Sequence, residues 1–143
     1  MKLFDVNVMV AAFRADHPDH ETALPYVERC LASGEQIAVP WGVWWSFLRV
    51  VTHPRIFDPP ATAEDALAFV AAFRAQPEFL ESEPGPGHLD SLRTSTASGE
   101  ATGNLIPDAA LAALAADHGA TIVTYDRDFA RFPGLEWETP TRG

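Results

Sequence analysis

The chain has 143 residues, a hydrophobic fraction of 47% and a formal net charge of −10 at pH 7. This length predicts one domain over residues 1–143, and the apolar fraction is ample for a single core without disulfide bonds. The acidic balance argues against a general basic clamp for nucleic acid, although a local basic patch and a bound metal ion can still bind phosphates. The single cysteine, Cys30, fits a reducing compartment.

The apolar segments predict neither a signal peptide nor a membrane span. Asp5 interrupts the apolar start at once. No apolar run approaches the ~18 residues that a membrane helix needs. We therefore expect a cytoplasmic protein without a membrane partner, and its negative charge favours a basic protein partner.

Short apolar runs alternate with helical patterns along the chain. Strands are expected at residues 2–5, 36–39, 79–81 and 120–125. Helices are expected at residues 6–14, from 16 to about 33, and at 41–52, 66–75, 87–96 and 107–118. Thr62 begins a sequence that resembles a capping box, and Gly119 is expected to end the last helix. The Ser/Thr/Gly-rich stretch 94–104 is expected to be a mobile loop.

This alternation predicts an α/β fold with a mostly parallel sheet covered by helices on both faces. In such a sheet, ligands bind outside the carboxyl ends of the strands. Asp5 follows the first expected strand and Asp126 follows the last. The two side chains can therefore meet in space although they lie far apart in sequence. Asp108 opens a helix, and Asp128 follows Asp126 closely.

Carboxylates that gather in one crevice repel each other, and a divalent metal ion commonly relieves the repulsion. Mg²⁺ and Mn²⁺ prefer such hard oxygen ligands, and they can activate a water for attack on a phosphodiester. Zinc is disfavoured because the five histidines lack close ligand spacing. We therefore predict a metal-dependent phosphodiesterase. Each acid also has a purely structural interpretation, as a helix cap, a first-turn charge or a turn residue.

Four segments of the chain also resemble a known family: Leu3–Asn7, Phe47–Arg55, Gly103–Ala109 and Thr124–Phe129. In this order and spacing they resemble PIN-domain ribonucleases, and more narrowly the VapC toxins of bacterial VapBC toxin–antitoxin pairs. The resemblance implies a three-layer α/β/α sandwich and cleavage of structured RNA that depends on Mg²⁺ or Mn²⁺. Transfer RNA is a family-level guess for the substrate. The resemblance also implies a homodimer and a VapB antitoxin that blocks the site.

Asp5, Asp108 and Asp126 match the acidic positions of the family, where they would bind the metal ion and act in catalysis. Asp128 matches a further, less regular metal-binding position. The family often carries a glutamate where this chain has Ser46, and serine supplies no negative charge at neutral pH. Metal affinity is therefore expected to be lower than in relatives with four acids.

Two alternatives follow from this departure, and a third is a different metal-dependent phosphatase or nuclease on a similar α/β scaffold. Glu100 in the expected loop is a conceivable substitute for the missing acid. A catalytically weakened PIN-like module would bind RNA or antitoxin without cutting. A haloacid-dehalogenase-type phosphatase is disfavoured because Asp5-Val6-Asn7 lacks the second aspartate of that family's motif.

Three further residues are expected to support the site. Arg49 shares a helix face with Ser46 and is expected either to contact phosphate or an antitoxin carboxylate, or to form only a surface ion pair. Asn7 can hydrogen-bond a metal ligand or cap a helix. Thr124 can orient Asp126 or simply fill a buried strand.

Large apolar side chains cover most of the circumference of the expected helix 41–52, namely Trp41, Trp44, Trp45, Phe47 and Leu48. One face must be core, and the excess is either further core or a contact with antitoxin or a second copy. Their spacing does not indicate base stacking in particular. The candidates for RNA contact among the basic residues are Arg14, Arg55, Arg93 and Arg127, which no sequence feature brings together.

Overall fold

A computed structural model describes all 143 residues as one four-stranded sheet with helices on both sides. The strands are β1 (Lys2–Phe4), β2 (Ile37–Ala38), β3 (Thr121–Val123) and β4 (Trp137–Glu138). The α-helices are α1 (Val6–Phe13), α2 (His20–Ala32), α3 (Trp41–Val51), α4 (Ala63–Arg74), α5 (His88–Ser98) and α6 (Ile106–His118). Two 3₁₀-helices complete the chain, η1 (Gly103–Leu105) and η2 (Arg127–Arg131).

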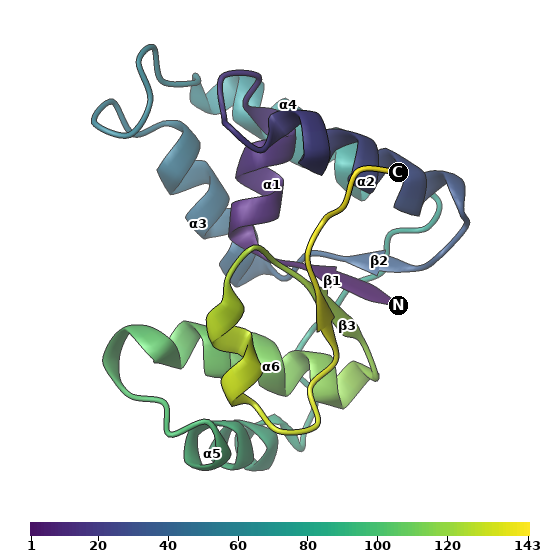
Figure 1. The fold of residues 1–143 in the computed structure, drawn as a ribbon, viewed down its shortest axis with the longest axis vertical. Coiled ribbons are helices and arrows are strands. Elements are labelled where there is room, and N and C mark those ends of the chain that lie inside the picture. Colours follow the sequence, from purple (N-terminus) through teal and green to yellow (C-terminus); the bar gives the residue numbers. More distant parts are fainter.

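The strands are parallel and lie in the order β2-β1-β3-β4, so that β1 is paired on both sides. Figure 1 shows α1 to α4 above the sheet and α5 and α6 below it. This arrangement confirms the expected α/β/α sandwich. Because parallel strands point the same way, the carboxyl ends of β1 and β3 meet at one edge of the sheet. The register pairs Phe4 with Val123 and therefore places Asp5 beside Thr124 at that edge.

Capping residues explain where several helices begin and end. The Asp5 side chain accepts a hydrogen bond from the backbone N–H of Val6 and caps α1. The Thr62 hydroxyl accepts from the Asp65 N–H, which confirms the cap expected for α4. Gly119 adopts a left-handed conformation with φ of 62° and ends α6 as expected. No helix combines the length and the apolar character required to cross a membrane.

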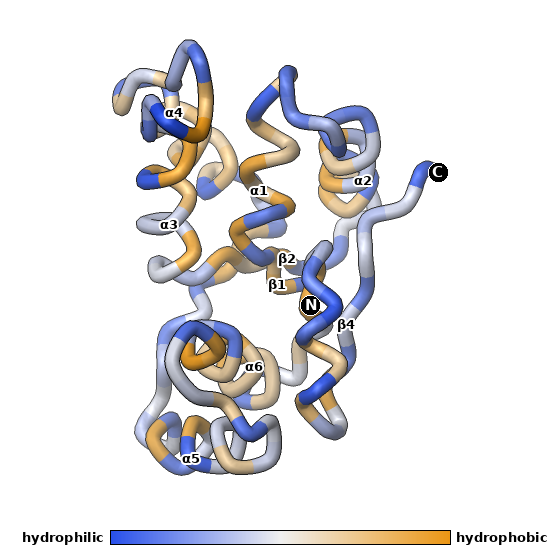
Figure 2. Tube along the Cα trace, turned by 60° about the vertical axis from the view of Figure 1, so that its left-hand side comes forward, coloured by the Kyte–Doolittle hydropathy of each residue, from blue (hydrophilic) through white to orange (hydrophobic).

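The core is continuous across the sheet, and Figure 2 shows the apolar segments of α1, β1 and β2 meeting at its centre. Above the sheet, aromatic rings from α1, α3 and α4 pack edge-to-face, as in the pairs Phe13–Phe47 and Trp44–Phe73. Trp44 and Phe47 are fully buried. The apolar surface of α3 is therefore mostly core, and among its large apolar side chains Trp45 is 66% exposed and Trp41 38% exposed.

Several sequence-based boundaries were wrong. The second helix begins at His20 rather than near Asp16. The expected strand at 79–81 is reduced to a single bridge between Phe79 and Ile37. Much of the expected loop 94–104 is helical, because α5 continues to Ser98 and η1 occupies 103–105. The edge strand β4 and the 3₁₀-helix η2 were missed because each has few residues and no clear hydrophobic periodicity.

Candidate functional site

Two of the predicted acids lie at the carboxyl ends of adjacent strands. Asp5 is the first residue after β1, is buried, and donates its backbone N–H to the Val123 carbonyl of β3 at 3.0 Å. Asp126 follows β3 by three residues, is half-buried, and caps η2 by accepting a hydrogen bond from the Asp128 N–H at 2.9 Å. Parallel pairing of β1 with β3 therefore brings these two acids to the same edge.

The Thr124 hydroxyl joins the two acids. It donates to Asp5 Oδ2 at 2.8 Å and accepts from the Asp126 N–H at 3.0 Å. Thr124 is completely buried, so solvent does not compete for either hydrogen bond. This geometry agrees with the interpretation that Thr124 orients Asp126. It also shows that Thr124 orients the carboxylate of Asp5.

Asn7 forms the second connection between the strand ends. Its Nδ2 donates to Asp5 Oδ2 at 3.2 Å and to Thr124 Oγ1 at 3.1 Å. Its Oδ1 accepts the Tyr125 N–H at 3.0 Å, so the amide bridges the start of α1 and the loop after β3. Because Oδ1 of Asp5 also accepts a hydrogen bond from the Val6 N–H, hydrogen bonds hold both oxygens of this carboxylate in place.

The third acid, Asp108, faces the same region from the first turn of α6. Asp5, Ser46 and Asp108 all line one cleft of about 240 Å³ between α1, α3 and α6. Ser46 therefore stands where an additional acid would face Asp5 and Asp108. Its hydroxyl forms no hydrogen bond within the protein and is only partly buried, so it is available to a ligand in the cleft.

Electrostatic repulsion marks this cluster. Burial raises the pKa of Asp108 to about 6, and the negative charges of Asp5, Asp126 and Asp128 add to the shift. Burial also raises the pKa of Asp5, although the hydrogen bonds from Thr124, Val6 and Asn7 oppose that effect. The negative charges of the other three acids thus act on Asp108, and that of Asp126 also acts on Asp5. A cation placed beside these carboxylates would be stabilised.

The donor set fits a hard divalent cation without forming a closed cage. No three His, Cys, Asp or Glu side chains are arranged as a ready-made metal site. Mg²⁺ is commonly held by one or two carboxylates, with waters completing its octahedral shell. The mutual repulsion that raises the pKa of Asp108 is what such an ion would relieve. The chemistry of the cluster therefore fits Mg²⁺ or Mn²⁺.

The remaining predicted residues are exposed and do not line the cleft. Asp128 is exposed at the start of η2, and Arg49 is exposed on α3 without an ion-pair partner. The structure gives no support to Glu100 as a substitute acid, because it is exposed after α5 and is not among the main charges acting on Asp108.

Arg131 was missed by the sequence reasoning. Its charge lowers the pKa of Asp108 against the larger opposing effects of burial and the neighbouring acids. Its Nη1 donates to the Gly99 carbonyl at 3.3 Å, which ties η2 to the loop after α5. No sequence signal pointed to this residue, because its position depends on the path of η2 and of that loop.

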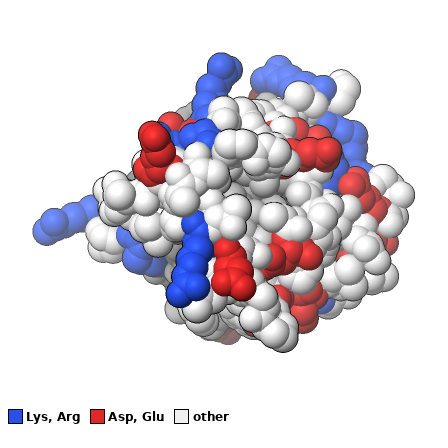
Figure 3. All heavy atoms as spheres, turned by 90° about the horizontal axis from the view of Figure 1, so that it is seen from below, with Lys and Arg blue, Asp and Glu red and all other residues white.

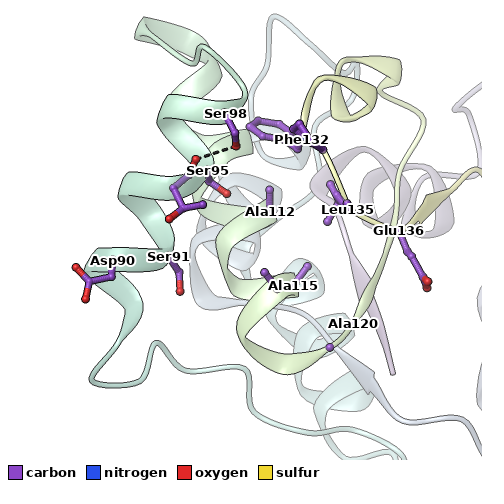
Figure 4. A pocket seen from close by; sticks show the side chains of 15 residues that line it. Asp90, Ser91, Ser95, Ser98, Ala112, Ala115, Ala120, Phe132, Leu135 and Glu136 are labelled. Atoms are coloured by element: carbon purple, nitrogen blue, oxygen red, sulfur yellow. Dashed lines mark hydrogen bonds between the residues drawn. The ribbon is translucent and has the colours of Figure 1, made fainter.

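A larger hollow of about 660 Å³ lies elsewhere, between α5, α6 and residues 132–136. Figure 4 shows hydroxyl side chains of α5 on one side and small alanines of α6 at its floor. Its two carboxylates, Asp90 and Glu136, lie at opposite ends of this view. None of the predicted site residues lines this hollow, so the smaller acidic cleft is the better candidate site.

Comparisons with known proteins agree with the resemblance noted in the sequence. A PIN domain model matches residues 2–135. The ribonucleases VapC25 and VapC31 of Mycobacterium tuberculosis are 49% and 48% identical over 140 residues, covering 98% of this chain and 99% of each relative.

Solved structures show the same fold. In the crystal structure of VapBC2 from Rickettsia felis bound to a promoter DNA fragment, one chain aligns with a TM-score of 0.68 at 22% identity, covering 97% of this chain and 98% of that one. VapC20 of M. tuberculosis, a toxin that cleaves the sarcin-ricin loop, aligns with a TM-score of 0.66 at 17% identity, covering 95% and 99%.

Proposed function

The chain belongs to the PIN-domain family, and from that premise we propose that it is an endoribonuclease toxin of the VapC type that depends on Mg²⁺ or Mn²⁺. Residues 1–143 would act as one PIN-like domain and cut phosphodiester bonds of structured RNA. The ribonuclease relatives span the full length of the chain, which supports carrying their activity over.

The observation that carries the proposal is the gathering of acids from three separate elements. Asp5 follows β1, Asp108 begins α6, and Asp126 follows β3. Their charges act on one another strongly enough to contribute to the raised pKa of Asp108. Such repulsion destabilises the unliganded fold, and a bound divalent cation relieves it, so clustered acids of this kind support a metal site.

Asp5, Asp108 and Asp126 would hold the ion, with Asp128 assisting from the start of η2. When bound, a divalent ion neutralises charge at the phosphodiester and lowers the pKa of a coordinated water. The protein's own contribution is positional. Thr124 and Asn7 fix the Asp5 carboxylate, and Thr124 also fixes the backbone at Asp126.

Substitution of the acids tests this proposal. Asp5→Asn or Asp126→Asn should abolish RNA cleavage while circular dichroism shows a folded protein, because the amide keeps the shape but supplies no anionic ligand. Asp90→Asn is the matched control, since Asp90 is exposed in the first turn of α5 and away from the cleft. Full activity of either Asp5→Asn or Asp126→Asn would refute the assignment of the metal site.

The proposed partners follow from the family. A VapB-type antitoxin would inhibit the toxin, and the solved VapBC structures support such a partner. A homodimer and a cytoplasmic location are proposed on the same family-level grounds. The formal charge of −10 favours an antitoxin segment that carries basic residues.

Ser46 supports one alternative, a weakened module that binds RNA or antitoxin without cutting. The serine lines the cleft beside Asp5 and Asp108 but brings no charge. Ser46→Glu distinguishes the two functions. If the site is impaired, Mg²⁺ affinity measured by calorimetry should rise sharply and cleavage should appear. If the wild-type protein already cleaves RNA, the substitution should change cleavage only modestly, and the weakened-module alternative is removed.

A further inference from the structure

One face of α3 continues the acidic cleft outward to solvent. Gly42, Val43 and Ser46 line the cleft from this helix. Trp45 lies three residues after Gly42, and Arg49 lies three residues after Ser46 and four after Trp45. Residues three or four apart are neighbours on a helix surface. Gly42, Trp45 and Arg49 therefore form a strip at the rim of the cleft, called here the α3 strip.

Trp45 is the exposed aromatic of this strip. Its side chain is 66% exposed, the largest fraction among the large apolar residues of the protein. Trp41, one turn earlier, is 38% exposed, and the Arg74 guanidinium lies 4.4 Å from its ring centroid. No such cation or aromatic ring covers Trp45. An exposed aromatic ring of this kind offers a stacking surface for one nucleobase.

Arg49 adds a free cation to the strip. Most basic side chains of this chain are engaged, as in the ion pairs Arg14–Asp16 and Arg74–Glu81. Figure 3 shows acidic groups spread over the face seen from the α5 and α6 side, with most basic groups at its margins. Arg49 forms neither an ion pair nor a side-chain hydrogen bond and is exposed. Five unused N–H donors beside an exposed aromatic ring suit a phosphate next to a base.

Gly42 leaves the inner end of the strip open. A Cβ built on Gly42 would meet no atom within 4 Å outside its immediate neighbourhood. Close packing therefore does not require a glycine at this position in the first turn of α3. A flat ligand can therefore lie against the backbone of α3 between Trp45 and the cleft.

We propose that the α3 strip is a nucleotide-binding subsite for the RNA substrate. A base next to the scissile phosphodiester stacks on the indole of Trp45, and an adjoining phosphate contacts Arg49. The inference rests on the proposed ribonuclease function and names residues that hold the substrate beside the acids.

Binding of a short unstructured RNA oligonucleotide, measured by fluorescence anisotropy with Ca²⁺ in place of Mg²⁺, tests the subsite. Trp45→Ala should weaken binding about 10-fold, within the range expected for one stacked base, while Trp45→Phe should keep most of the affinity. Leu67→Ala is the matched control, because Leu67 is 52% exposed on α4 and should leave binding unchanged. Arg49→Gln should lower the slope of log affinity against log salt by about 0.7, the value for one phosphate contact.

Cleavage assays separate this inference from the function on which it rests. Trp45→Ala should raise KM about 10-fold and leave kcat nearly unchanged. If the wild-type protein cleaves RNA and Trp45→Ala has unchanged KM and affinity, the subsite is wrong and the ribonuclease stands. If the variant instead changes only the oligomeric state in light scattering, or only antitoxin binding, the strip is a protein contact and the proposal is overturned. No cleavage by the wild-type protein would refute the function itself.

Discussion

Asp108→Asn should make the protein more stable while removing its activity. Burial and three neighbouring carboxylates raise the pKa of Asp108 from 3.8 to about 6, so its charged form is destabilised in the folded state. A shift of this size is equivalent to about 3 kcal/mol without screening. Because Asp108 is only partly buried, solvent screening reduces the expected gain to about 1 kcal/mol. The loss of a charge at the N-terminus of α6 offsets a few tenths of that gain.

The pH dependence of this gain follows from the direction of the shift. Between about pH 6 and 3.8 the folded protein binds a proton at Asp108 that the unfolded chain does not. The repulsion therefore operates above pH 6 and disappears as the pH falls through this window. Urea unfolding at low salt with EDTA should show Asp108→Asn as the more stable protein at pH 7.5, with the difference vanishing near pH 3.5.

Asp65→Asn is the control for this measurement, because Asp65 also lies in the first turn of a helix but neither lines the cleft nor acts on Asp108. It should lower stability slightly at pH 7.5. Added Mg²⁺ should stabilise the wild-type protein and have little effect on Asp108→Asn. A stability for Asp108→Asn that is equal to or below that of the wild-type protein at pH 7.5 would refute the account of mutual repulsion.

Two other substitutions test the hydrogen bonds of Thr124 at the site and the packing of the fold at Gly99. Thr124→Val removes the hydrogen bonds to Asp5 and to the Asp126 N–H, and it should lower the free energy of unfolding by about 2 kcal/mol. Because the hydrogen bond from Thr124 lowers the pKa of Asp5, its loss should raise that pKa and move the acidic limb of the pH–rate profile to higher pH. Thr124→Ser should retain both properties, and equal effects of the two variants would contradict the role of the hydroxyl. A Cβ at Gly99 would overlap the buried ring of Phe132, so Gly99→Ala should lower the melting temperature by an amount equivalent to about 1–3 kcal/mol. A Cβ at Gly85 would meet no atom within 4 Å, so Gly85→Ala should leave the melting temperature unchanged.

The sequence predicted the architecture because strong local signals determine it. Buried apolar runs mark β1 and β3, and capping residues such as Thr62 and Gly119 mark helix ends. Once parallel pairing is assumed, the carboxyl ends of the strands must share one edge, which places Asp5 and Asp126 together. That reasoning needs no tertiary detail, and the structure agrees with it.

The details that escaped prediction depend on tertiary contacts. The loop expected at 94–104 is partly helical because α5 packs along α6, which overrides a composition rich in Ser and Thr. β4 has two residues and forms only because β3 offers an unpaired edge. Arg131 reaches the region of Asp108 through the short helix η2. The division of the α3 aromatics into buried Trp44 and exposed Trp45 likewise depends on where α1 and α4 pack.

Incubation of purified, antitoxin-free protein with total RNA tests the central claim most directly. Reactions with Mg²⁺ or Mn²⁺ would be compared with reactions in EDTA and with Asp5→Asn. The account predicts discrete RNA fragments that require both the metal ion and Asp5. Absence of fragments from the folded wild-type protein in either metal, or equal cleavage by Asp5→Asn, would contradict it.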